Sequence, residues 1–198
     1  MSRHLLIAGA CITALSLAAC GKKAEVTEGA ATPAEQAMTP DANPAATIPT
    51  PQNEAAAVDF VPKAAASDMF EVAAARIAQK RSANAEVKKF AGDMITAHTK
   101  STEGLKKAIA DSGQTITPPA ALPADLQGKL DDLNKAEAKD FDKMYVDGQV
   151  DAHQGALNLM QRYAEDGDVM SIKAFAAATA PVVQGHLDMA KAMQAKMK

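Results

Sequence analysis

Three histidines are spaced so that each falls in the apolar seam of a different predicted helix. They are His98, His153 and His186, and the fourth histidine of the chain, His4, lies near the N-terminus. Imidazole is a ligand for Zn, Cu, Fe and Ni in proteins, and it also forms hydrogen bonds inside cores. A carboxylate, Glu71, lies in the seam of a further predicted helix. These side chains indicate either a metal site or a hydrogen-bonded structural network.

The positions of these four side chains along their helices predict that they meet. Glu71 lies 13 residues before Asn84, where the next helix is expected to start, and His98 lies 14 residues after it. If the third long helix starts at that end of a bundle and the fourth finishes there, His153 and His186 lie 16 and 11 residues from it. At ~1.5 Å per residue, the difference of five residues is ~7 Å of helix. All four groups therefore approach the middle of the bundle.

Two methionines near the histidines extend the metal alternative. Met94 precedes His98 by four residues and Met189 follows His186 by three, and thioethers beside imidazole favour Cu(I). Methionine at helical spacing also fills gaps in apolar cores, so both side chains have an ordinary structural explanation. A di-iron oxidase site is not expected, because it requires Glu-x-x-His on two helices. The residues three before the histidines are instead apolar: Ile95, Val150 and Val183.

Other polar residues precede His153 on the same predicted helix. Tyr145 lies eight residues before it, a separation of ~12 Å, so the two side chains cannot share one ligand shell. We expect Asp142, Tyr145 and Gln149 to form a structural polar network.

Apolar residues recur at spacings of three and four rather than two, which predicts an all-α chain. The second and third long helices are separated by about 24 residues that include three prolines, whereas the other long helices follow each other closely. Two hairpins joined by one long crossover indicate a ferritin-like four-helix bundle. The expected helices cover 59–82, 84–112, 137–165 and 168–197, with a short extra helix over 126–133 in the crossover.

The helix ends carry recognisable capping residues. Asp59 and Asn84 are the expected N-caps of the first two long helices, and Gly113 is expected to end the second. Asp68 and Glu71, however, also have the spacing of a capping box. A later start of the first helix would then give Glu71 a local structural role.

Residues 1–19 have the pattern of a secretory signal, with a short basic segment before an apolar run over 5–17 that is too short to span a bilayer. The run ends in Leu-Ala-Ala-Cys, which resembles a bacterial lipobox. Cys20 is therefore expected to be acylated, as by palmitate, and to anchor the chain in a membrane. Cleavage that releases a soluble chain is the alternative. Gly21 resembles an outer-membrane sorting residue, so we expect the protein at the outer membrane, facing the periplasm.

Residues 20–58 are rich in Ala, Pro, Thr, Glu and Gln, which predicts a disordered tether before a domain over 59–198. Removal of Arg3 leaves 20 basic and 24 acidic side chains, a formal charge of −4. This mildly acidic balance gives no electrostatic footprint for nucleic acid. The mature chain keeps no cysteine other than Cys20, and it shows neither a Ser/His/Asp set nor a phosphate-binding loop. The sequence therefore gives no motif for an enzyme.

Three spaced motifs run through the predicted helices: Phe90-x-x-x-Met94-x-x-x-His98, Phe141-Asp142-x-x-Tyr145 with His153 eight residues on, and Phe175-Ala176 followed by Pro181 and His186-Leu187. By these motifs residues 58–194 resemble the domain-of-unknown-function family 4142. The resemblance implies an exported or outer-membrane bacterial protein with a ferritin-like bundle and implies no activity. The family usually has an Asp-His pair where this chain has Ala97-His98. If that Asp were a ligand or held the imidazole, metal binding here would be weakened.

The sequence thus predicts an envelope lipoprotein whose helical domain is a structural, interaction or stress-related module. The alternative is a binding module in which Glu71, His98, His153 and His186 hold one Cu, Zn or Fe ion. Apart from the membrane reached through Cys20, no partner can be read from the chain.

Overall fold

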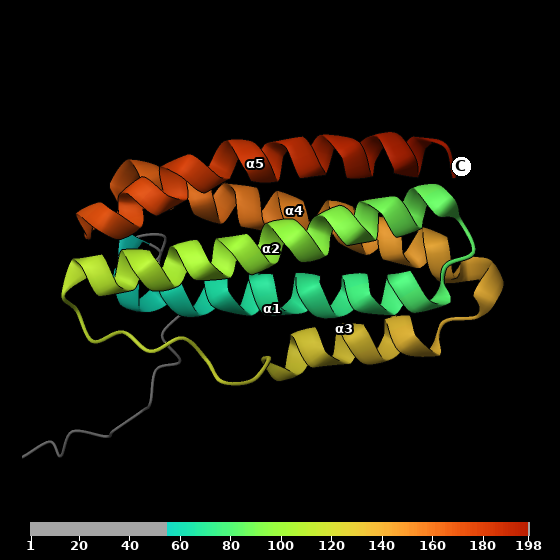
Figure 1. The fold of residues 1–198 in the computed structure, drawn as a ribbon, viewed down its shortest axis with the longest axis horizontal. Helices are drawn as coiled ribbons and strands as arrows, with labels where there is room; N and C mark the ends of the chain where they lie inside the picture. The colour runs from blue at the N-terminus through green and yellow to red at the C-terminus, as the bar shows by residue number, and fades with distance from the viewer. Residues whose placement is uncertain (1–54, 198) are drawn as a thin grey trace, which may run out of the picture. The chain divides into compact units, whose positions relative to one another are not determined.

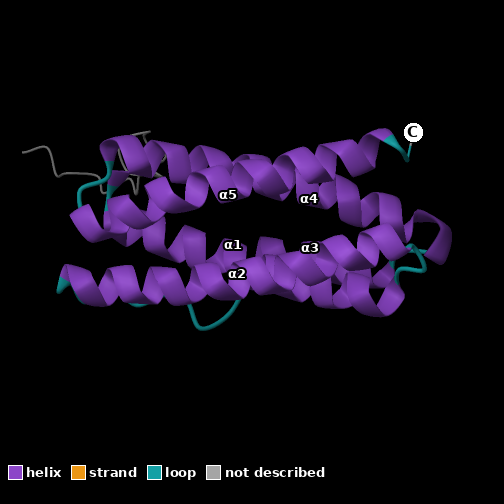
Figure 2. Ribbon diagram, turned by 45° about the horizontal axis from the view of Figure 1, so that its top comes forward, coloured by secondary structure: helices purple, strands orange, loops and turns teal. Residues whose placement is uncertain are grey.

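A computed structural model describes residues 55–197, and within this range every regular element is an α-helix, as Figure 2 shows. The all-α prediction is confirmed. The predicted signal sequence, Cys20 and most of the predicted tether lie outside the described residues. None of the described helices is long and apolar enough to cross a membrane. The helices are α1 (Ala57–Arg81), α2 (Ala85–Ser112), α3 (Ala124–Lys135), α4 (Ala138–Asp166) and α5 (Met170–Ala195).

The four long helices form two antiparallel hairpins, α1–α2 and α4–α5, packed into one bundle (Figure 1). After α2 the chain returns along the outside of α1 through the proline-rich connection and α3. Arg81, at the end of α1, fixes the far end of this crossover by donating to the carbonyl oxygens of Leu133 and Asn134 at 2.8 and 2.7 Å. As a result α4 starts beside the α1–α2 turn, which is the arrangement that the long connection predicts.

Two of the three predicted capping residues act as expected. The Asn84 side chain accepts hydrogen bonds from the backbone N–H groups of Glu86 and Val87 at the start of α2. Gly113 ends α2 with a φ of 67°, the left-handed conformation that glycine adopts readily. Asp59 as the N-cap is wrong, because α1 starts earlier, at Ala57, and Asp59 lies in its first turn.

The N-terminus of α1 is capped from a distant part of the chain. The Ala57 N–H donates to Asp168 Oδ1 at 2.9 Å, and the Tyr163 hydroxyl donates to the same oxygen at 2.9 Å. The capping-box alternative is also wrong, because Asp68 and Glu71 lie in the interior of α1 and both are buried. Their carboxyl groups therefore face the inside of the bundle instead of a helix end.

The apolar core consists of two main clusters with a polar layer between them. One cluster lies toward the α1–α2 turn and contains the edge-on pair Phe90 and Tyr145, with ring centroids 6.4 Å apart. The other lies toward the α4–α5 turn and contains Phe60 stacked on Tyr163 at 4.1 Å. Burial of these apolar groups supplies most of the driving force for packing the helices. The buried polar residues between the clusters are Asp68, Glu71, His98, Gln149, His153 and His186.

Gly167 allows the α4–α5 turn to close over the core. A Cβ added there would lie 2.5 Å from the Tyr163 carbonyl oxygen and 2.6 Å from its ring. We therefore expect Gly167→Ala to destabilise the fold by about 1–3 kcal/mol in urea denaturation, because the stacked Tyr163 has to shift. Gly128→Ala is the control, since a Cβ at that helical position meets no atom within 4 Å and should stabilise by up to about 1 kcal/mol. Equal effects at both glycines would contradict this account.

Candidate metal centre

Three imidazole rings meet in the polar layer, each carried by a different helix. His98 comes from α2, His153 from α4 and His186 from α5. Their ring centroids are 5.4 to 5.8 Å apart, and one ring nitrogen of each lies within 4.8 Å of those of the other two. All three side chains are buried. The predicted convergence of these histidines is therefore seen in the structure.

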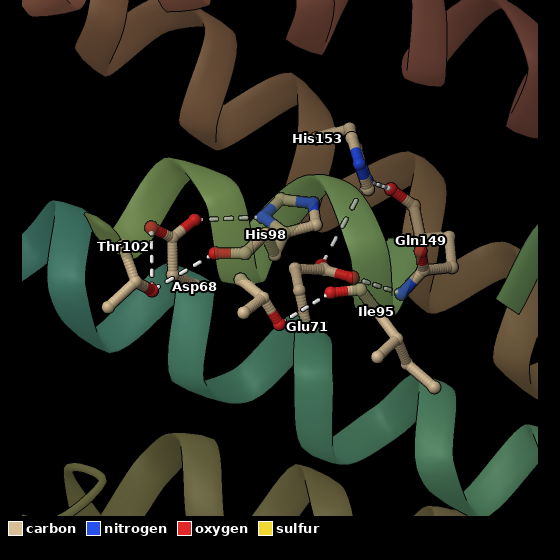
Figure 3. Close-up of polar contacts among 8 residues, drawn as sticks. Asp68, Glu71, Ile95, His98, Thr102, Gln149 and His153 are labelled. Atoms are coloured by element: carbon tan, nitrogen blue, oxygen red, sulfur yellow. Dashed lines mark hydrogen bonds and ion pairs between the residues drawn. The ribbon is translucent and has the colours of Figure 1, made fainter. Parts of the chain in front are cut away.

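Two of the rings are oriented by hydrogen bonds to their Nδ1 atoms. His98 Nδ1 lies 2.8 Å from Asp68 Oδ1, and His153 Nδ1 lies 2.9 Å from the Gln149 carbonyl oxygen (Figure 3). Because a carbonyl oxygen only accepts, His153 Nδ1 carries the hydrogen and its Nε2 keeps a free lone pair. The Nε2 atoms of His98 and His153 and the Nδ1 atom of His186 are buried without a hydrogen-bond partner within the described residues.

Asp68 is the residue of this site that sequence reasoning missed. It lies four residues after Ala64 and three before Glu71, so it shares their inward face of α1. Its Oδ2 accepts a hydrogen bond from the Thr102 hydroxyl at 3.3 Å, and its Oδ1 holds His98. A carboxylate behind a ligating histidine fixes the ring and raises its basicity. The spacing that suggested a capping box was the available signal, and it also fits two carboxyls on one buried stripe.

The electrostatic environment separates the three histidines. Burial and the charge of His98 lower the pKa of His153 to about 3 and that of His186 to about 4. Burial also lowers the pKa of His98, but the hydrogen bond to Asp68 and the charges of Glu71 and Asp68 outweigh it, so this pKa is raised. His153 and His186 are consequently neutral at pH 7, which is the state in which imidazole binds metal.

Glu71 lies beside the histidines and is held by Gln149. Its Oε2 accepts from Gln149 Nε2 at 2.6 Å, and its Oε1 lies 3.9 Å from His153 Nδ1 (Figure 3). The neutral state of His153 means that this contact is not an ion pair at pH 7. Burial raises the pKa of Glu71 to about 7, an effect that the His98 charge and the Gln149 hydrogen bond reduce without cancelling. Of the four predicted ligands, the three imidazoles are thus the ones whose nitrogens converge.

The remaining predicted site residues take varied positions. Met94 is buried in the apolar cluster toward the α1–α2 turn, whereas the Met189 side chain is 43% exposed. Gln149 belongs to the buried polar network through Glu71, as predicted. Asp142 Oδ1 and the Tyr145 hydroxyl are buried without a hydrogen-bond partner in the part of the chain that the structure describes. Metal ligation by either methionine stays a prediction.

Comparison with known proteins identifies the family of this domain. Residues 42–193 match the family described as "Domain of unknown function (DUF4142)". The chain belongs to this family. The match covers both hairpins and the crossover, and it includes all three histidines of the centre. The family description names no activity.

A solved structure has a similar fold. The crystal structure of a DUF305 fragment from Deinococcus radiodurans aligns with a TM-score of 0.61 and 16% sequence identity, covering 74% of this chain and 97% of that one. At this identity the likeness shows the shared fold alone. No curated protein matches the chain. In this DUF4142 domain, the function must therefore be inferred from the residues themselves.

The Ala97-His98 departure from the usual DUF4142 pair does not leave His98 without a carboxylate. Asp68, on the neighbouring helix α1, bonds its Nδ1 atom instead. The imidazole is therefore oriented here by a contact between helices, and the weakness expected from the sequence does not apply to its orientation.

Glu71 should make the metal-free fold sensitive to alkaline pH. Its carboxyl has a pKa of about 7 when folded and 4.5 as the model value, so its burial costs nothing below about pH 4.5 and progressively more as pH rises through 7. Glu71→Gln keeps an oxygen that can accept from Gln149. We expect this variant to be stabilised by on the order of 3 kcal/mol at pH 8 in urea with a chelator present, with little gain at pH 4.5. The same gain at both pH values would sink this explanation.

Proposed function

We propose that this domain binds one transition-metal ion between His98, His153 and His186. The observation that carries the proposal is the convergence of three buried imidazole nitrogens, one from each of three helices, within 4.8 Å. Buried polar atoms in proteins nearly always have a partner, and the unpartnered nitrogens of these rings have none among the described residues. A metal ion would satisfy all three lone pairs at once.

The spacing of the nitrogens is compatible with a single ion after a small adjustment. Three points that are at most 4.8 Å apart share a centre no more than about 2.8 Å from each. Since Zn–N bonds are ~2.0–2.1 Å long, each nitrogen would have to move inward by roughly 0.7 Å. Rotation of a side chain about its χ angles can provide a movement of this size.

Charge and protonation support the same proposal. Two of the three rings are neutral at pH 7 without any metal, so only His98 retains a raised pKa that opposes ligation. The carboxyls of Asp68 and Glu71 can balance the charge of a divalent ion, which is otherwise expensive to bury. A bound cation would in turn favour the ionised form of Glu71.

The donor set favours particular metals. Imidazole nitrogens suit Zn, Cu, Fe and Ni, whereas Ca²⁺ and Mg²⁺ prefer oxygen ligands. Three protein ligands leave a further coordination position for water or another small group. Because the histidines are buried, we infer that the centre serves to hold or sense the ion and that an enzymatic role is not its purpose.

A structural role for the same cluster is the second candidate. Buried water could bridge the unpartnered nitrogens, and the polar layer would then only fix how the four helices pack. The hydrogen bonds from His98 to Asp68 and from Gln149 to Glu71 favour this candidate, since they already link helices without a metal. The domain would then act as an interaction module.

Metal-dependent stability separates the two candidates. Using a chain of residues 21–198 treated with chelator, we expect Zn²⁺ or Cu²⁺ at 100 times its Kd to stabilise the fold by about 2.7 kcal/mol, measured as a rise in Tm and in urea midpoint. His98→Ala should abolish this rise. Asp68→Asn should keep the three ligands and weaken binding by about 10–100-fold in a competitive chelator titration.

The control is Asp142→Asn, which changes another carboxyl on the bundle without touching His98. It should bind metal as the parent chain does. If neither Zn²⁺, Cu²⁺ nor Fe²⁺ raises the stability of the parent chain, and His98→Ala merely destabilises it, the structural candidate holds and the metal centre is rejected.

We further propose that the domain is attached to the outer membrane through an acylated Cys20 and faces the periplasm. The support is the Leu-Ala-Ala-Cys ending of the apolar N-terminal run, followed by Gly21. In bacterial cells grown with radiolabelled palmitate, the full chain should incorporate label and fractionate with the outer membrane. Cys20→Ser should lose the label, whereas Cys11→Ser should keep it. Equal labelling of both variants would refute acylation at Cys20.

A further inference from the structure

A cavity of about 740 Å³ lies between α1, α3 and α4, away from the three histidines. No residue of α2 or α5 lines it, and none of the three histidines reaches it. Its volume falls within the range of small-molecule sites, which is ~300–1,000 Å³. The metal proposal leaves this cavity unexplained.

The shape of the cavity follows the helices that line it. Its walls extend along α1 from Pro62 to Ala74 and along α4 from Met144 to Leu159. At 1.5 Å per residue, these segments are ~18 and ~22 Å long, so the space is elongated along the bundle. Most of its lining is apolar, and the larger apolar side chains include Phe70, Leu126, Leu133 and Leu159.

Two glycines on α4 keep the cavity open. Gly148 and Gly155 both line it, and a Cβ added at either position meets no atom within 4 Å. Helix interiors disfavour glycine by ~1 kcal/mol relative to alanine, so these positions give up stability where a side chain would otherwise occupy the space.

Unpartnered polar atoms are found in the cavity lining toward one end of α4. Tyr145 and Gln149 line the cavity one helical turn apart, and both residues are almost completely buried. The Tyr145 hydroxyl and the Gln149 Oε1 atom have no hydrogen-bond partner within the described residues. Burial, with a smaller effect from Glu71, raises the pKa of Tyr145, so the hydroxyl keeps its proton. One of these groups can donate a hydrogen bond and the other can only accept.

We propose that this cavity binds an elongated aliphatic molecule with a single uncharged hydroxyl head, such as a long-chain alcohol. The head accepts a hydrogen bond from Tyr145 and donates one to Gln149, which satisfies both unpartnered atoms. The aliphatic tail runs along α1 and α4 toward Pro62 and Leu159, past the space left by the two glycines. A charged head is disfavoured because burial of an unpaired charge is far more costly than burial of a hydroxyl.

The test uses the chain of residues 21–198, which keeps every described residue, with 1-decanol as the probe. Saturating 1-decanol should raise the Tm of the parent chain by about 3–6 °C. Gly148→Leu fills the cavity and should abolish this shift while the fold is retained. The matched control is Gly185→Leu on α5, where an added Cβ also meets no atom within 4 Å, and this variant should keep the full shift.

A second pair of measurements tests the head group. Tyr145→Phe should weaken 1-decanol binding by about 10-fold, because it removes one hydrogen bond to the hydroxyl. The ether 1-methoxydecane cannot donate to Gln149, and it should bind the parent chain more weakly than 1-decanol does. No shift with the parent chain, the same shift in Gly148→Leu and Gly185→Leu, or equal binding of alcohol and ether would each overturn the proposal.

Discussion

The structure depends on the balance of polar groups buried in the middle of the bundle. Asp68 and His98 join α1 to α2 by one buried hydrogen bond, and Glu71 and Gln149 join α1 to α4 by another. Each group would be costly to bury alone, so these pairings restrict how the helices can pack. The two apolar clusters on either side supply the cohesion, while the polar layer between them fixes which side chains face each other.

Periodicity and chain distances determine how much of this fold the sequence predicts. Helix spans follow from local spacing, and Asn84 and Gly113 act through neighbouring backbone, so both were predictable. The start of α1 was not, because its cap, Asp168, lies 111 residues away from Ala57. The three histidines could be brought together by counting residues from the turns, since regular helices preserve axial distance. Asp68 could not be assigned to His98, because the rotation of one helix against another depends on packing.

Family membership and site chemistry carry different information about this protein. The match to DUF4142 and the likeness to the DUF305 fragment concern the bundle, which can be retained while its interior changes. The interior is where this chain is distinctive: the carboxylate beside His98 comes from α1, although the neighbouring position on its own helix is Ala97. A contact carried by another helix can replace one carried by an adjacent residue.

The cap on α1 also has a mechanical consequence. The Ala57 N–H donates to Asp168 Oδ1, the Asp168 N–H donates to the Ala55 carbonyl oxygen, and Phe60 stacks on Tyr163 just behind them. A pulling force applied to the chain before residue 55 would therefore pass at once into the α4–α5 hairpin. Several contacts would have to break together before α1 could peel away. The point where the chain enters the bundle is thus reinforced against extension.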